Sequence, residues 1–70
     1  MFTIKSESEE GTYFLCNHWN KNKAFWIEKS KLKPDMLFKT EGLAKRSLTR
    51  LLKIMPEYST DKFTTVEIDL

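Results

Sequence analysis

The first thirty residues of the chain show the alternation and the aromatic content that are typical of β-strands. In residues 2–7 successive side chains fall on opposite sides with a period of two, as in a half-buried strand. Residues 12–19 are rich in the aromatic residues that favour strands, and residues 24–29 resume the pattern. Turn-forming residues occupy the two gaps, at 8–11 and 20–23. We therefore predict three strands joined by two turns.

A change to helical periodicity follows a polar connection at residues 30–36. Thr40 is a suitable N-cap, Glu41 follows in the first turn, and Pro56 ends the periodic stretch. Apolar side chains recur there at helical spacing and form one stripe: Ala44, Leu48, Leu51, Leu52 and Met55. The opposite side carries Lys45, Arg46, Thr49, Arg50 and Lys53. We predict an amphipathic helix with a basic solvent face.

Alternation returns in residues 62–70, where Val66, Ile68 and Leu70 fall on one side of a last strand. Leu37 to Lys39 is compatible with a further short extended segment. The predicted order is β-β-β-α-β in one domain spanning residues 1–70. An α+β fold, with a small antiparallel sheet of three to four strands and the helix packed on one face, is the simplest two-layer arrangement.

Composition narrows the class of protein. The chain has 70 residues, of which 40% are hydrophobic and 31% charged, as in a folded domain and unlike a disordered or fibrous chain. A chain this short leaves little room for a large active site. It contains no apolar run of membrane-spanning length, no signal-peptide pattern at its N-terminus and one cysteine. We expect a cytoplasmic protein that does not associate with membranes.

Charge is distributed unevenly along the chain. Residues 21–53 carry ten Lys or Arg against three acidic residues, an excess of seven positive charges, whereas residues 1–20 and 54–70 are both net acidic. The net charge of +2 is too small to argue for nucleic acid by itself. The basic middle segment keeps nucleic acid as an alternative partner.

Cys16 and His18 are the only cysteine and the only histidine. A strand through both would place their side chains on one face, but a metal site needs three or four ligands, and the chain has no further Cys or His. Residues two apart on a strand are also poorly placed for a thiol–imidazole nucleophile. No glycine-rich phosphate loop is present, because Gly11 and Gly42 are isolated. We expect neither an enzyme nor a bound metal or cofactor.

The aromatic residues around the second turn are the more informative feature. Both faces of the second and third strands carry large apolar groups, and one helix covers only one face of a sheet. We therefore expect part of this aromatic surface to be exposed and to anchor a partner. The predicted partner-binding residues are Tyr13, Trp19, Lys21, Lys23, Phe25 and Trp26. The basic helix face, Lys45, Arg46, Arg50 and Lys53, is either solvated or a second contact surface.

The strand-to-helix junction of this sequence carries Phe38, Thr40, Ala44 and Leu48, and its last strand carries Val66 and Glu67. In these residues the junction and the last strand resemble those of small phage and prophage proteins of Gram-positive bacteria. The junction is also similar to that of the arm-binding domain of tyrosine recombinases, where a three-stranded sheet enters the DNA major groove. That second resemblance implies a set of groove-facing residues: Lys21, Lys23, Trp26 and Lys29.

Two functions are predicted from these observations. The first is a non-catalytic binding module, a phage accessory protein that binds and modulates or inhibits a host or defence protein. The alternative is a small DNA-binding domain that uses the basic segment 21–53. For the oligomeric state, the sequence is compatible with both a monomer and a homodimer.

Overall fold

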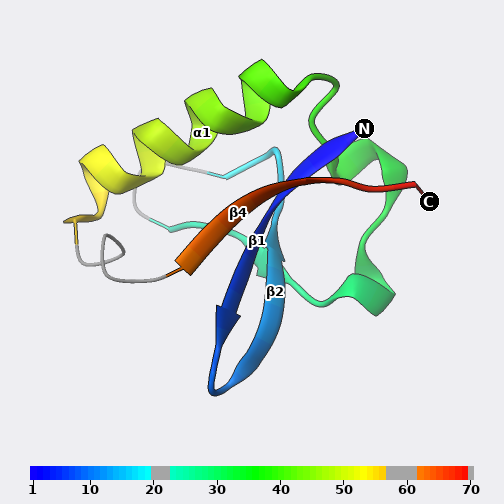
Figure 1. The fold of residues 1–70 in the computed structure, drawn as a ribbon, viewed down its shortest axis with the longest axis horizontal. Helices are drawn as coiled ribbons and strands as arrows, with labels where there is room; N and C mark the ends of the chain where they lie inside the picture. The colour runs from blue at the N-terminus through cyan, green and yellow to red at the C-terminus, as the bar shows by residue number, and fades with distance from the viewer. Residues whose placement is uncertain (20–22, 57–61, 70) are drawn as a thin grey trace.

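A four-stranded antiparallel sheet is the centre of the computed structural model, which describes residues 1–19, 23–56 and 62–69. The strands lie in the order β3-β2-β1-β4 (Figure 1). Their bounds are Phe2–Ser8 for β1, Gly11–Leu15 for β2, Trp26–Ile27 for β3 and Lys62–Glu67 for β4. One α-helix, α1 (Glu41–Ile54), precedes β4. The predicted α+β class and the order β-β-β-α-β are confirmed.

The inner strand β1 pairs with β2 on one side and with β4 on the other. A tight connection of two residues joins β1 to β2, and Gly11 begins β2 at a φ of 133°, a conformation that residues with a Cβ rarely adopt. The pairing of β1 with β4 runs from Phe2 opposite Glu67 to Glu7 opposite Lys62. The first and last strands of the chain are therefore neighbours in the sheet.

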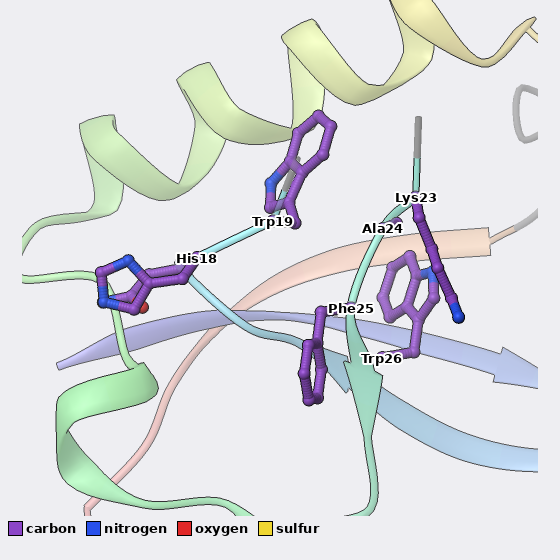
Figure 2. Close-up of a pocket in the computed structure, with 7 residues that line it drawn as sticks. His18, Trp19, Lys23, Ala24, Phe25 and Trp26 are labelled. Carbon is purple, nitrogen blue, oxygen red and sulfur yellow. The ribbon is translucent and has the colours of Figure 1, made fainter. Parts of the chain in front are cut away.

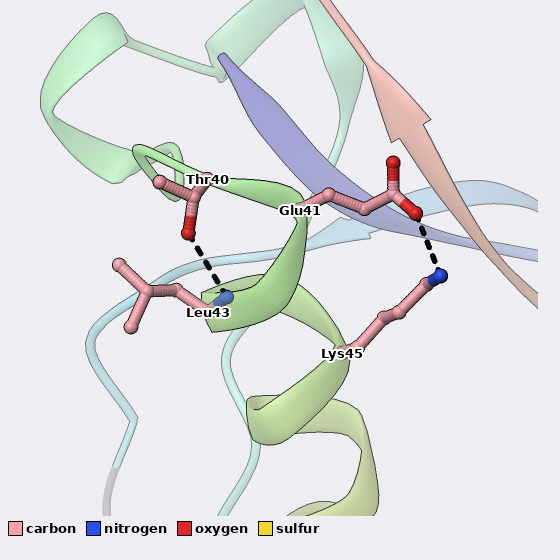
Figure 3. A network of polar contacts seen from close by, with 4 residues as sticks. All are labelled: Thr40, Glu41, Leu43 and Lys45. Atoms are coloured by element: carbon pink, nitrogen blue, oxygen red, sulfur yellow. Dashed lines mark hydrogen bonds and ion pairs between the residues drawn. The ribbon is translucent and has the colours of Figure 1, made fainter.

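Helix α1 begins and ends close to the predicted positions. The Thr40 side chain accepts a hydrogen bond from the backbone N–H of Leu43 at 3.2 Å, and Lys45 forms an ion pair with Glu41 at 2.6 Å (Figure 3). The cap satisfies one of the N–H groups that have no partner within the helix. The backbone N–H of Met55 donates to the carbonyl of Leu51 just before Pro56.

The helix packs on one face of the sheet, as predicted, and the larger core lies between them. Ile4, Leu15, Ala44 and Leu51 are fully buried there. Leu48 and Phe63 pack against this core and are partly buried. The apolar stripe predicted for the helix therefore faces the sheet except at Leu52, which is half-buried and lies outside this core.

A second layer covers the opposite face of the sheet, where the sequence led us to expect exposed aromatics. The connection after β3 folds into two short 3₁₀ helices, η1 (Lys29–Lys31) and η2 (Pro34–Met36). Leu32 and Leu37 from this segment form a buried cluster with Phe14 of β2. We expected part of the aromatic surface to be exposed, and Phe14 is not part of what is exposed, because the polar connection supplies apolar side chains that cover it.

The second and third strands are shorter than predicted. The backbone N–H of Cys16 still pairs with the carbonyl of Phe25, but the N–H of Asn17 donates to Met36 instead. The Asn17 amide also donates to the carbonyls of Asp35 and Leu37, at 3.0 and 2.9 Å. These bonds direct the chain away from the sheet, so β2 ends at Leu15. Most of the predicted turn at 20–23 lies outside the described residues.

Candidate functional site

Trp19 lies between the end of β2 and helix α1. Its indole Nε1–H donates to the hydroxyl of Ser47 at 3.0 Å, and the ring packs against the larger core. The guanidinium of Arg50 lies over the ring, 4.9 Å from the ring centroid, a distance at which a cation is attracted to an aromatic face. Trp19 is thus fixed to two successive turns of the helix.

A groove runs beside this contact, between residues 43–50 of α1, residues 17–19 and residues 34–39. We call it the Trp19 groove; its volume is about 620 Å³. Leu43 lines it and is 44% exposed, and the buried Phe38 also lines it. The groove therefore offers apolar surface to a ligand.

The same groove carries an excess of positive side chains. Lys39, Arg46 and Arg50 line it, with Asp35 as the one acidic side chain among the described lining residues. Within the described part of the chain, none of the three cations has an ion-pair partner, unlike Lys5 and Lys45. Because these side chains are exposed, their charges are available to an anionic group.

A second hollow of about 720 Å³ lies on the other side of Trp19 (Figure 2). Phe25 is 51% exposed at this hollow, and Lys23 is also exposed. Figure 2 shows Trp19 close under the helix, with Phe25 and Trp26 on the β3 side. Residues 20–22, which connect Trp19 to Lys23, lie outside the described residues.

The aromatic residues that were predicted to form one surface lie at different places in the structure. Trp26 stacks on Phe63 of β4, with ring centroids 5.6 Å apart and an interplanar angle of 10°. Tyr13 is half-buried and lines a hollow with that pair. Of the four predicted aromatics, only Phe25 is classed as exposed. Lys21, also predicted at this site, lies outside the described residues.

All four residues of the predicted basic helix face are exposed: Lys45, Arg46, Arg50 and Lys53. They do not act as one surface, because Lys45 pairs with Glu41 and Arg50 stacks on Trp19. Arg46 and Arg50 face the Trp19 groove. The structure therefore brings part of the aromatic set and part of the basic set together in one place.

Cys16 and His18 do not share a strand face, and that expectation is wrong. Both lie beyond the end of β2, where Asn17 holds the chain against η2. Cys16 is buried and His18 is exposed beside the Trp19 groove. Within the described ranges, no three His, Cys, Asp or Glu side chains gather into a possible metal site.

Sequence reasoning missed the parts of the groove that are supplied by Lys39, Leu43 and Ser47. The one available signal was the position of Leu43, which departs from the apolar stripe of the helix and so had to face elsewhere. Nothing local in the sequence connects Ser47 to Trp19, because 28 residues separate them.

None of the described helices combines the length and the apolar character needed to cross a bilayer. Comparisons of the chain with protein-family models, with curated proteins and with solved structures found no match.

Proposed function

We propose that this domain is a non-catalytic module that binds another protein through the Trp19 groove. The observation that carries the proposal is the meeting of Trp19, Arg46 and Arg50, which come from two separately predicted binding sets, at one groove. Tryptophan and arginine are the side chains that most often dominate the binding energy of protein interfaces. Exposed leucine beside them supplies apolar area that a partner would bury.

The phage resemblance supplies the setting for this proposal. In that setting the partner is a host or defence protein, whose activity the bound domain modulates or inhibits. A module of this kind needs no catalytic group of its own, since occupation of the partner's surface is sufficient for inhibition.

Binding of nucleic acid is the second candidate, and the exposure of the basic helix face favours it. The mode implied by the recombinase resemblance fits less well, because both faces of the sheet contact other segments of the chain. A phosphate backbone would also leave the exposed Leu43 without an apolar contact. We therefore place protein binding first.

The proposal is tested by affinity capture, in which tagged protein is incubated with a lysate of a Gram-positive host and the bound proteins are identified. Wild-type protein is compared with R46E/R50E and with K29E/K31E, which makes the same charge change in the exposed η1 segment. We expect a stoichiometric protein to bind the wild type and K29E/K31E and to be lost with R46E/R50E. Urea unfolding of all three proteins checks that each is folded.

Two results would contradict the proposal. One is the absence of any stoichiometric protein on the wild type, and the other is equal retention by R46E/R50E. A mobility shift of DNA at low salt that disappears in R46E/R50E and decreases steeply as salt is raised would favour the nucleic-acid alternative.

A further inference from the structure

The Trp19 groove has a definite sign of charge and a definite spacing between its cations. We propose that it recognises an extended acidic segment of the partner protein, in which one apolar and two acidic side chains occupy alternate positions. This inference rests on the proposed function and specifies the class of ligand.

The spacing follows from the helix. Arg46 and Arg50 are four residues apart on α1, which separates them by about 6 Å along the helix axis. In an extended chain, side chains two residues apart point to the same side and lie about 6.6 Å apart. Two carboxylates in alternate positions therefore match the separation of Arg46 and Arg50 along the helix axis.

Stacking on Trp19 prepares Arg50 for this role. The indole is itself held by Ser47 and the core, and the Arg50 guanidinium lies over its ring. The N–H groups at the edge of the guanidinium stay available for a carboxylate. Because the side chain is already restrained, it loses less conformational freedom when it binds.

The apolar position of the ligand follows from Leu43, which lies three residues before Arg46 on the helix, or about 4.5 Å along its axis, about 2 Å less than the spacing of alternate positions in an extended chain. The partner's apolar side chain would contact Leu43, and its acidic side chains would follow in alternate positions toward Arg46 and Arg50. Lys39 adds a further positive charge at the groove. Asp35 alone opposes this charge within the described lining, so a basic segment is disfavoured.

Fluorescein-labelled peptides test the inference directly by fluorescence anisotropy. The first contains Leu, Glu and Glu in alternate positions separated by Ser, and the second has the same composition with the two Glu residues adjacent. A third replaces both Glu residues by Lys. We expect the alternating acidic peptide to bind the wild type at least about tenfold more tightly than either control.

The charge-reversed protein provides the reciprocal measurement. R46E/R50E should lose the acidic peptide and gain affinity for the lysine peptide, whereas K29E/K31E should bind like the wild type. R46Q/R50Q, which removes the charges without reversing them, should bind neither peptide well. R46E alone leaves the Arg50 guanidinium over Trp19 and should still weaken binding of the acidic peptide, which keeps the test valid if the double variants perturb Trp19.

Equal binding of the alternating and adjacent peptides, or binding unchanged in R46E/R50E, would overturn the inference. So would failure of all three peptides to bind the wild type. If the peptides fail while a protein from the lysate is still lost with R46E/R50E, the proposed function stands and only the acidic ligand class is rejected.

Discussion

Trp19 combines three interactions that are usually made by different residues. It packs against the core, donates a hydrogen bond to Ser47 and supports the Arg50 guanidinium. A buried indole N–H that lacks an acceptor is costly, so Ser47 contributes to the stability of the fold as well as to the shape of the groove. The contacts of Trp19 that shape the groove therefore also stabilise the fold.

Ser47→Ala should lower the free energy of unfolding by about 1 kcal/mol, because it leaves the Trp19 N–H without its protein acceptor. Urea denaturation followed by tryptophan fluorescence measures the change. Thr49→Ala is the matched control, since Thr49 is exposed and its hydroxyl donates only to the carbonyl of Lys45 within the helix. The control should change stability by less than about 0.5 kcal/mol. An equal effect of the two substitutions would show that the Trp19–Ser47 bond contributes nothing.

At the scale of the element, helix α1 is defined at its start by one side chain. Thr40 caps the first turn, and Glu41 places a negative charge where the helix dipole favours one. The first turn also carries Gly42 and the exposed Leu43, which contribute little burial there. The cap therefore matters more here than in a helix whose first turn is buried.

Thr40→Ala should destabilise the domain by about 1 kcal/mol, and Thr40→Ser should restore most of that loss because serine keeps the accepting oxygen. Thermal unfolding followed by circular dichroism gives both values. Equal stability of the alanine and serine variants would indicate that the cap bond does not stabilise the helix.

The sequence was sufficient to predict elements whose signal is local. The helix has a cap, a stripe and a terminating proline within 17 residues, and β1 shows its period of two directly. Asn17 marks where local signals fail, because its side chain bonds carbonyls 18 and 20 residues away. The same limit explains why the Trp19–Ser47 contact and the groove were not predicted, although Trp19, Arg46 and Arg50 were each named as candidates.

At the scale of the whole molecule, the sheet is shared by two apolar clusters on its opposite faces. Adjacent residues of β2 divide between them: Leu15 packs under the helix and Phe14 packs against Leu32 and Leu37. The segment with η1 and η2 is therefore part of the folded core. We expect that loss of packing in either apolar cluster will lower the stability of both clusters.

Leu37→Ala should lower the free energy of unfolding by about 2–4 kcal/mol, as expected for a buried leucine. The helix signal in far-UV circular dichroism should shift to lower urea together with the tryptophan fluorescence. Lys33→Ala, an exposed change in the same segment, should leave both transitions within about 0.5 kcal/mol. A helix transition that stays unchanged in Leu37→Ala would contradict a shared core.

The pairing of β1 with β4 has a consequence for the time at which the fold can form. Phe2 of β1 lies opposite Glu67 of β4, so β1 lacks one of its two neighbours until almost the whole of this sequence has left the ribosome. Contacts between such distant residues also slow folding, since a long loop must close before they stabilise anything. Residues 1–56 on a stalled ribosome should therefore remain sensitive to protease, and protection should appear only after residue 67 has emerged.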